Sequence, residues 1–186
     1  MTVRSEWGPA NGPRPEPDPA NAALFADVRA SVTAEVDAPA EAVWDLLADP
    51  ARVGEVSPEC VEGRWIEGAS RPEPGARFEG VNRLGDYEWV RPCTVTTAER
   101  PTAYAYVAHD RWDVPAADWS FAIEPLGERC RVTETFAHRP DGLSGLRIAA
   151  DADPANAAAA VAARLASLRE GMAATLARLG EAARRT

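Results

Sequence analysis

PANAAAAVAARLASLREGMAATLARLGEAAR, residues 154–184, has the pattern of one long amphipathic helix. Asp153 can cap free N–H groups, and Pro154 suits a first helical turn. At about 1.5 Å per residue this helix is roughly 45 Å long, more than a small domain can enclose. The rest of the chain must therefore supply a large apolar surface along it. One face of the helix carries the apolar residues, at spacings of three and four: Val161, Leu165, Leu168, Met172, Leu176 and Leu179.

The residues before this helix alternate between apolar and polar, as β-strands do. Residues 28–36 form one such run, and a short helix from Pro39 and a helical turn at residues 51–56 follow it. The short spacing of the next runs favours antiparallel pairing, because parallel strands need long crossovers. We therefore expect an α+β fold in which one curved sheet grips the C-terminal helix, with residues 139–153 as a loop before it. The further strand-like runs are 61–67, 75–83, 87–99, 104–108, 117–125 and 129–138.

A chain of 186 residues, 46% of them hydrophobic, is most simply one domain with an appendage. Residues 1–26 are rich in proline, and we expect a disordered tail there that forms neither helix nor ladder. Trp7 either makes no contact in this tail or docks on the domain or on a partner. The remaining residues, 27–186, are expected to form the ligand-binding domain.

Charge and apolar pattern exclude several classes of partner. The net charge of −9 argues against nucleic acid and anionic membrane surfaces, which attract basic patches. No apolar run approaches the roughly 20 residues of a membrane span, and no signal-peptide core is present, so a cytoplasmic protein is expected. Cys60, Cys93 and Cys130 are expected to be free thiols, and the two histidines are too few for a metal site. We expect no metal and no cofactor.

Strand alternation also indicates which side chains face the helix. Three polar residues, Asn82, Arg91 and Glu134, share these faces with apolar and aromatic ones. Either Arg91 and Glu134 form a structural ion pair, or a bulge turns one of them outward, or they orient a ligand in an unfilled interior. Gly171 lies inside the long helix, where it allows either a close contact with the sheet or room for a ligand. The apolar members of the inward faces include Phe78, Trp89, Cys93, Trp119, Phe121 and Phe136.

Three stretches, VTAEVDAPAEAVWDLLADPARV, PGARFEGVNRLGDYEWVRPCTV and DWSFAIEPLGERCRVTETF, together with the terminal helix, resemble the START-like helix-grip superfamily. The resemblance covers about residues 28–182 and is closest to the polyketide cyclase/dehydrase-like branch, also called SRPBCC proteins. It implies a seven-stranded antiparallel sheet around the C-terminal helix, two short helices after the first strand, and a hydrophobic cavity between them. In the aromatase/cyclases of this group an inward Arg polarises a substrate carbonyl. The matching position here is Cys93, and Arg91 on the same face is the substitute.

The expected function is binding of a small hydrophobic or aromatic metabolite, lipid-like or polyketide-like, by a monomer or a homodimer. The alternative is a cofactor-free polyketide aromatase/cyclase or dehydratase. In that case Arg91 holds the carbonyl oxygen, Glu134 moves a proton, and Tyr106, in preference to Tyr104, donates a hydrogen bond. His109, Asp110 and Trp112 either line the mouth or form an ordinary polar loop. The expected ligand-binding residues are Phe78, Asn82, Trp89, Cys93, Trp119, Phe121, Phe136, Leu168 and Met172.

Overall fold

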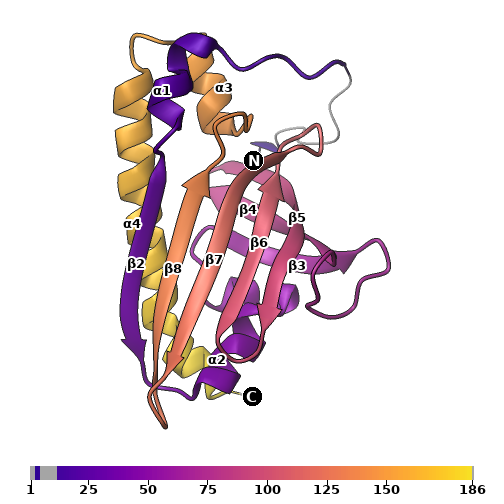
Figure 1. Ribbon diagram of the computed structural model, residues 1–186, viewed down its shortest axis with the longest axis vertical. Helices are drawn as coiled ribbons and strands as arrows, with labels where there is room; N and C mark the ends of the chain where they lie inside the picture. Colours follow the sequence, from indigo (N-terminus) through magenta and orange to yellow (C-terminus); the bar gives the residue numbers. More distant parts are fainter. Residues whose placement is uncertain (1–2, 5–11, 186) are drawn as a thin grey trace.

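The computed structural model describes residues 3–4 and 12–185, and in it one curved sheet packs against one long helix (Figure 1). Within these residues the sheet has eight strands: β1 (Val3–Arg4), β2 (Arg29–Val36), β3 (Cys60–Ile66), β4 (Arg77–Leu84), β5 (Tyr87–Glu99), β6 (Ala103–His109), β7 (Pro115–Pro125) and β8 (Cys130–His138). The helices are η1 (Pro19–Asn21), α1 (Ala22–Phe25), α2 (Ala40–Leu47), η2 (Pro50–Glu55), α3 (Gly145–Ala152) and α4 (Ala157–Ala183). Strands β2 to β8 pair antiparallel in the order β2-β8-β7-β6-β5-β4-β3. The predicted helix-grip fold, with seven antiparallel strands and a long C-terminal helix, is confirmed.

Helix α4 has the apolar face that the sequence predicts. It packs against β2 and β8 and meets α2 and α3 near its two ends. Leu168, Met172 and Leu179 on that face are buried. The predicted start at Pro154 is wrong, because the helix begins at Ala157. Just before it, the side-chain amide of Asn156 donates to the Asp153 carboxylate at 2.8 Å.

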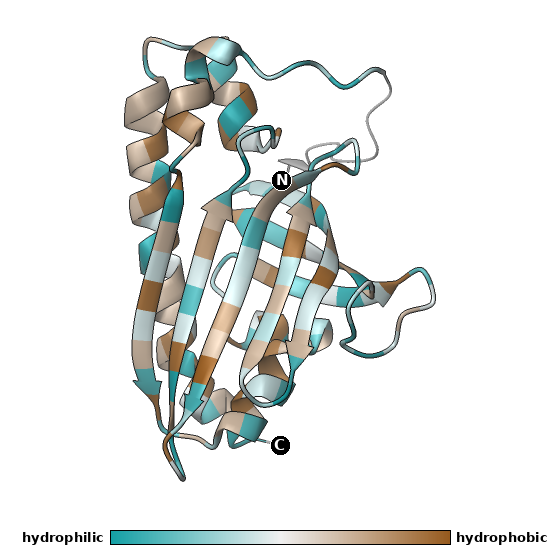
Figure 2. Ribbon diagram, viewed as in Figure 1, coloured by the Kyte–Doolittle hydropathy of each residue, from teal (hydrophilic) through white to brown (hydrophobic). Residues whose placement is uncertain are grey.

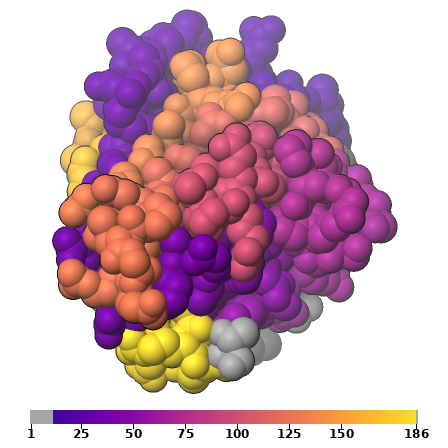
Figure 3. All heavy atoms as spheres, turned by 60° about the horizontal axis from the view of Figure 1, so that its bottom comes forward, coloured from indigo at the N-terminus to yellow at the C-terminus, as the bar shows by residue number. Residues whose placement is uncertain are grey.

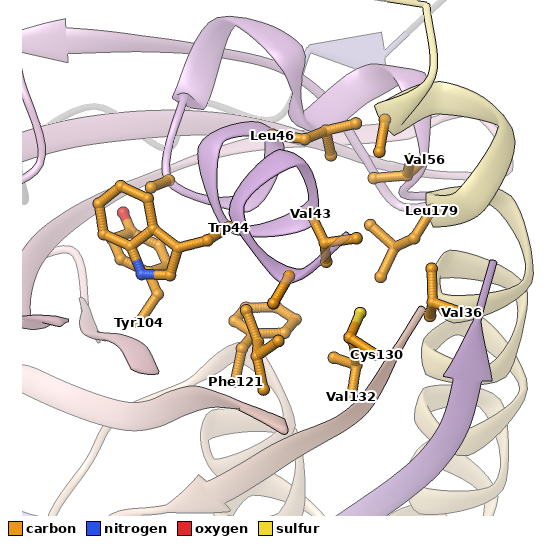
Figure 4. Close-up of a cluster of buried hydrophobic side chains, with 14 of the residues drawn as sticks. Val36, Val43, Trp44, Leu46, Val56, Tyr104, Phe121, Cys130, Val132 and Leu179 are labelled. Carbon is orange, nitrogen blue, oxygen red and sulfur yellow. The ribbon is translucent and has the colours of Figure 1, made fainter. Parts of the chain in front are cut away.

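Two clusters of buried apolar side chains hold the sheet on the helix. The larger one lies where α2 meets the C-terminal half of α4: Val43 and Leu179 point toward each other there, and Trp44 packs beside Tyr104 (Figure 4). Seen toward this end, atoms of α2 lie between the β7–β8 turn and the end of α4 (Figure 3). The smaller cluster lies at the opposite end of the sheet and includes Phe25 and Phe136. Between the two clusters the interior is not filled.

The outer face of the sheet is polar, as the alternation requires. Hydropathy alternates along the strands in Figure 2. Thr33 and Thr133 face each other across β2 and β8, with their hydroxyl oxygens 2.9 Å apart. Arg131 on β8 pairs with Glu124 on β7 at 2.5 Å. Because these side chains meet water, the opposite parity faces the helix, which is where the candidate site lies.

The prediction that residues 139–153 form a loop is wrong. Gly145–Ala152 form α3, whose Ser144 side chain caps the helix by accepting from the N–H of Arg147. Arg147 is only 1% exposed, and its guanidinium binds the Asp151 carboxylate one turn later, at 2.9 Å. A buried arginine that holds its own helix gives no apolar periodicity, so the alternation analysis missed this element.

The prediction that residues 1–26 form neither helix nor ladder is also wrong for the part that the structure describes. Asp18 caps a short helical turn that begins at Pro19, and α1 follows it. Phe25 is fully buried below the guanidinium of Arg147, with the Arg147 Cζ atom 4.8 Å from the ring centroid. Strand β1 pairs in parallel with Tyr87 and Glu88 of β5. Trp7 lies outside the described residues.

Candidate functional site

A cavity of about 410 Å³ lies between the sheet, α4 and the segment from η2 to β3. Its walls consist of side chains from strands β3 to β8 and from the inner face of α4. Among its lining residues, Pro58, Leu84, Tyr87 and Gly145 are exposed to solvent, so the entrance lies among the β4–β5 hairpin, the start of α3 and the end of η2. A cavity of this size can hold a ligand of a few fused rings or a short lipid chain.

The strand register sets the inner wall in rows. Glu134 on β8 faces Phe121 on β7, which faces Tyr104 on β6. In the next row, Phe136 faces Trp119, and Trp119 faces Tyr106. Both tyrosines line the cavity, so the preference for Tyr106 over Tyr104 was unnecessary: two residues apart on one strand, they share a face.

Arg91 lies in another part of the wall. It stands opposite Gly80 of β4, and its Nη1 donates to the carbonyl oxygen of His109 at 3.2 Å. Burial lowers the pKa of its guanidinium from the ordinary value. An arginine remains cationic at neutral pH even so, and it can present N–H donors to a ligand oxygen.

Glu134 is buried, and one of its carboxyl oxygens has no hydrogen-bond partner. Its side chain is in the cavity wall at 5% exposure, and its Oε2 atom accepts no hydrogen bond. Burial raises the pKa of Glu134 from 4.5 to about 7. Burial accounts for the pKa shift of Glu134 with no contribution from Arg91, and among the described residues the two form no ion pair, so the alternative of a structural bridge is wrong. Near neutral pH this carboxyl exists in both protonation states.

The Tyr106 phenol and the Cys93 thiol of the wall stay neutral. Burial raises the pKa of Tyr106 well above 10, and the nearby Cys93 and Glu134 add to that effect. Burial likewise raises the pKa of the Cys93 thiol far above 9. Tyr106 can therefore donate a hydrogen bond, but Cys93 is neither a nucleophile nor a cation that polarises a carbonyl. The three cysteines of the described chain are free thiols, as expected.

His138, which the sequence analysis considered only as a possible metal ligand, also lines the cavity. Nδ1 of His138 lies 2.7 Å from the carbonyl oxygen of Arg139 and must donate to it, so Nε2 accepts from the Ser144 hydroxyl at 2.7 Å. Burial lowers the pKa of His138 from 6.5 to about 4, and the ring is neutral at pH 7. His138 shares the parity of Glu134 and Phe136, and this signal was available in the sequence.

The loop after β6 is only partly a cavity wall. His109 lines the cavity, and its Nε2 lies 3.0 Å from the Thr94 hydroxyl. Asp110 and Trp112 do not line it. The buried Asp110 carboxylate instead accepts from the Trp112 and Val114 N–H groups and from Arg14, and thereby fixes the loop.

All twelve residues that were expected to bind or act on a ligand surround this one cavity; the assigned roles stay predictions. Gly171 lies in the wall too. A Cβ atom there meets only Pro58 Cγ, at 3.7 Å, so the close contact with the sheet is not what this glycine provides. The twelve residues are Phe78, Asn82, Trp89, Arg91, Cys93, Tyr106, Trp119, Phe121, Glu134, Phe136, Leu168 and Met172.

The sequence model of a family described as "Polyketide cyclase / dehydrase and lipid transport" matches residues 27–180. This chain belongs to that family. The resemblance to the polyketide cyclase/dehydrase branch of the helix-grip superfamily is therefore confirmed. The family description covers both catalysts and carriers of hydrophobic molecules, so membership favours a hydrophobic ligand and leaves the activity open.

Solved structures agree with this family fold. A polyketide cyclase-like protein, Cgl2372 of Corynebacterium glutamicum, is 25% identical, with a TM-score of 0.61 over 83% of this chain and 90% of its own. Protein NE0264 of Nitrosomonas europaea is 15% identical, with a TM-score of 0.61 over 86% and 96% of the two chains. The di-domain aromatase/cyclase StfQ of the steffimycin biosynthetic pathway is 12% identical, with a TM-score of 0.63 over 85% of this chain and 51% of its own. The last two likenesses concern the fold alone. No curated protein matches this family member.

Two further features bear on possible partners. Within residues 3–4 and 12–185, no helix is long and apolar enough to cross a membrane. The same part of the chain contains no group of three or more His, Cys, Asp and Glu side chains placed to hold a metal ion.

Proposed function

We propose that this protein binds a small hydrophobic or aromatic metabolite between the sheet and α4. The cavity of about 410 Å³ supports this proposal, because most of the surface of its walls is apolar, with polar side chains at separate points. Trp89 and Trp119 supply flat surfaces on which rings can stack. Arg91 and Asn82 would hold a polar group of the ligand.

The alternative proposal is a cofactor-free polyketide aromatase/cyclase or dehydratase. The presence of Arg91, Glu134 and Tyr106 in one cavity favours it. Glu134 would take a proton from an acidic methylene, and Arg91 would stabilise the enolate oxygen that forms. Against it, the position of the arginine in the aromatase/cyclases holds Cys93, a neutral buried thiol. Binding is therefore the better supported function.

The binding proposal is tested with a neutral aromatic probe, naphthylmethanol, and calorimetry. We expect binding to the wild type, with quenching of tryptophan fluorescence. Gly171→Leu should weaken binding at least about tenfold, because the new side chain extends from α4 into the space that the probe needs. Ala173→Leu, at an exposed position of the same helix, is the matched control and should bind normally.

Equal affinity in a folded Gly171→Leu protein would contradict binding in this cavity. Native mass spectrometry of the purified protein then identifies a metabolite that co-purifies. Catalysis is tested separately, by incubation with a synthetic poly-β-ketone thioester: a cyclised product that disappears in Glu134→Gln would favour the alternative function.

A further inference from the structure

Glu134 is the least compensated polar group of the cavity wall. It lies in the middle of β8, opposite Val32 on β2 and Phe121 on β7, neither of which can donate to it. Its Oε2 atom is buried and has no hydrogen-bond partner. A buried carboxylate in a folded protein is ordinarily paired or hydrogen-bonded, because taking the charge out of water is costly. The missing partner is therefore something that enters the cavity.

The surroundings of Glu134 suit a cation. Its row and the next contain Tyr104, Phe121, Trp119 and Phe136, whose ring faces attract positive charge. The net charge of −9 adds a weak general attraction for cations. An anionic ligand group would be repelled at this point of the wall and would find Arg91 instead.

The ionisable groups that share the wall with Glu134 do not compensate it. Tyr104 and Tyr106 from β6 and Cys93 from β5 are neutral, because burial raises the pKa of each. His138, further along β8, is neutral because burial lowers its pKa to about 4. Burial is the cause of the raised pKa of Glu134, with no contribution from the remaining ionisable lining groups, which are Arg91, Arg164, Glu59, His109, Tyr87 and Cys60.

We infer that the ligand is a hydrophobic amine, whose protonated nitrogen pairs with the Glu134 carboxylate while its apolar body stacks on the aromatic rows. This inference rests on the proposed binding function and specifies its ligand class. A hydroxyl group can also donate to Oε2, but it leaves the carboxylate charge uncompensated. A protonated amine supplies a donor and a countercharge together, and hydrogen bonds between charged groups are the stronger kind.

The test compares two probes of the same shape, naphthylmethylamine and naphthylmethanol, by calorimetry on the full chain. At about pH 8 the amine should bind about tenfold or more tightly than the alcohol. Between about pH 8 and pH 6 its affinity should fall about tenfold, because the amine needs the ionised Glu134, whose pKa is about 7 in the free protein. The affinity of the alcohol should stay nearly constant over that range.

Glu134→Gln should abolish both the preference for the amine and its pH dependence, while the alcohol still binds. Glu99→Gln, at an exposed position of β5, is the matched control and should keep both. The variant pair also separates Glu134 from the other ionisable lining groups. If the alcohol binds as tightly as the amine at pH 8, or the preference survives in Glu134→Gln, the inference is wrong and the binding function stands. If neither probe binds, the binding function fails as well.

Discussion

Glu134 and His138 lie on one face of β8, and burial moves their pKa values in opposite directions. The pKa of Glu134 rises from 4.5 to about 7, and that of His138 falls from 6.5 to about 4. Between pH 4.5 and about 7 the folded state holds a proton on Glu134 that the unfolded state has lost, so stability falls as pH rises through this range. The unfolded state holds an extra proton on His138, so stability falls as pH decreases from about 6.5 to 4. In the range common to both, the two contributions oppose each other.

Removal of either residue should therefore remove its own contribution from the pH dependence of stability. Relative to the wild type, Glu134→Gln should gain stability progressively as pH rises from 4.5 to 7, by about 3 kcal/mol in total. His138→Gln should gain relative stability as pH decreases from 6.5 to 4, by a similar amount. Urea unfolding at several pH values measures both differences. The unpaired amide left by each substitution adds an offset that does not depend on pH.

Glu99→Gln serves as the exposed control and should differ from the wild type equally at every pH. A stability difference for Glu134→Gln that does not change with pH would mean that this carboxyl is solvated or paired.

At the level of single residues, strand alternation predicted the inner wall well. Parity on four strands was enough to place Phe78, Arg91, Trp119 and Glu134 around one space, because each strand keeps a buried face. Parity does not say whether two inward polar groups meet, since that depends on sheet curvature and on side-chain conformation. The separation of Arg91 from Glu134 was therefore open until the fold was known.

Helix α4 contains two glycines, and their surroundings differ. A Cβ atom on Gly171 meets only Pro58, at an ordinary contact distance of 3.7 Å. A Cβ atom on Gly180 lies 3.3 Å from the backbone nitrogen of Asp37 and 3.4 Å from its carbonyl oxygen. The close approach that the sequence analysis considered for Gly171 thus occurs at Gly180, where β2 leads toward α2. Sequence spacing alone does not distinguish the two glycines.

We expect Gly171→Ala to raise the free energy of unfolding by about 0.5–1 kcal/mol, because alanine favours the helical backbone and the new methyl group has room. Gly180→Ala should gain nothing or lose stability, because its methyl group presses on rigid backbone. Urea denaturation of both variants measures the difference. Equal stabilisation by the two substitutions would show that Asp37 moves away freely.

Helix α3 and the N-terminal segment depend on Arg147 in place of an apolar stripe. The guanidinium donates to the carbonyl oxygens of Pro140 at 2.9 Å and Asp18 at 2.7 Å, besides its pair with Asp151. These contacts join α3 and the loop before it to the N-terminal segment at Asp18, which is remote in sequence. Hydrophobic periodicity does not reveal a polar centre of this kind. This explains why α1 and α3 were not predicted.

Arg147→Met should cost about 3 kcal/mol, because it removes one donor from the partly buried Asp151 carboxylate and the guanidinium donor from the carbonyl oxygens of Pro140 and Asp18. The backbone amides of Ala22–Phe25 should also lose protection in hydrogen exchange, since α1 packs on the same guanidinium. Arg129→Met, at an exposed pair with Glu35, is the control and should cost less than about 1 kcal/mol. Unchanged protection of α1 would contradict the role of Arg147 as the link.

On the scale of the whole molecule, the two core clusters join the sheet to α4 at the two ends of the cavity. The larger cluster fixes the end near α2, and the smaller one fixes the end near α1 and α3. Between them one ion pair joins α4 to the segment before β3: Arg164 donates to both carboxylate oxygens of Glu59, at 2.6 and 2.7 Å. Both side chains line the cavity and are about one quarter exposed. At this part of the cavity wall, the ion pair connects α4 to the edge of the sheet at β3.

If a ligand enters past this ion pair, its release should depend on the pair more than stability does. Arg164→Gln and Glu59→Gln should each speed release of bound naphthylmethylamine several-fold, as measured by stopped-flow displacement, and cost at most about 1 kcal/mol of stability. Salt should speed release from the wild type and leave the variants nearly unaffected, because it screens the same attraction. The double variant should release the probe no faster than either single variant, since each substitution already breaks the pair. Release rates that are the same in all four proteins would show that the ligand passes on the other side of this entrance, between the β4–β5 hairpin with its exposed Leu84 and the start of α3.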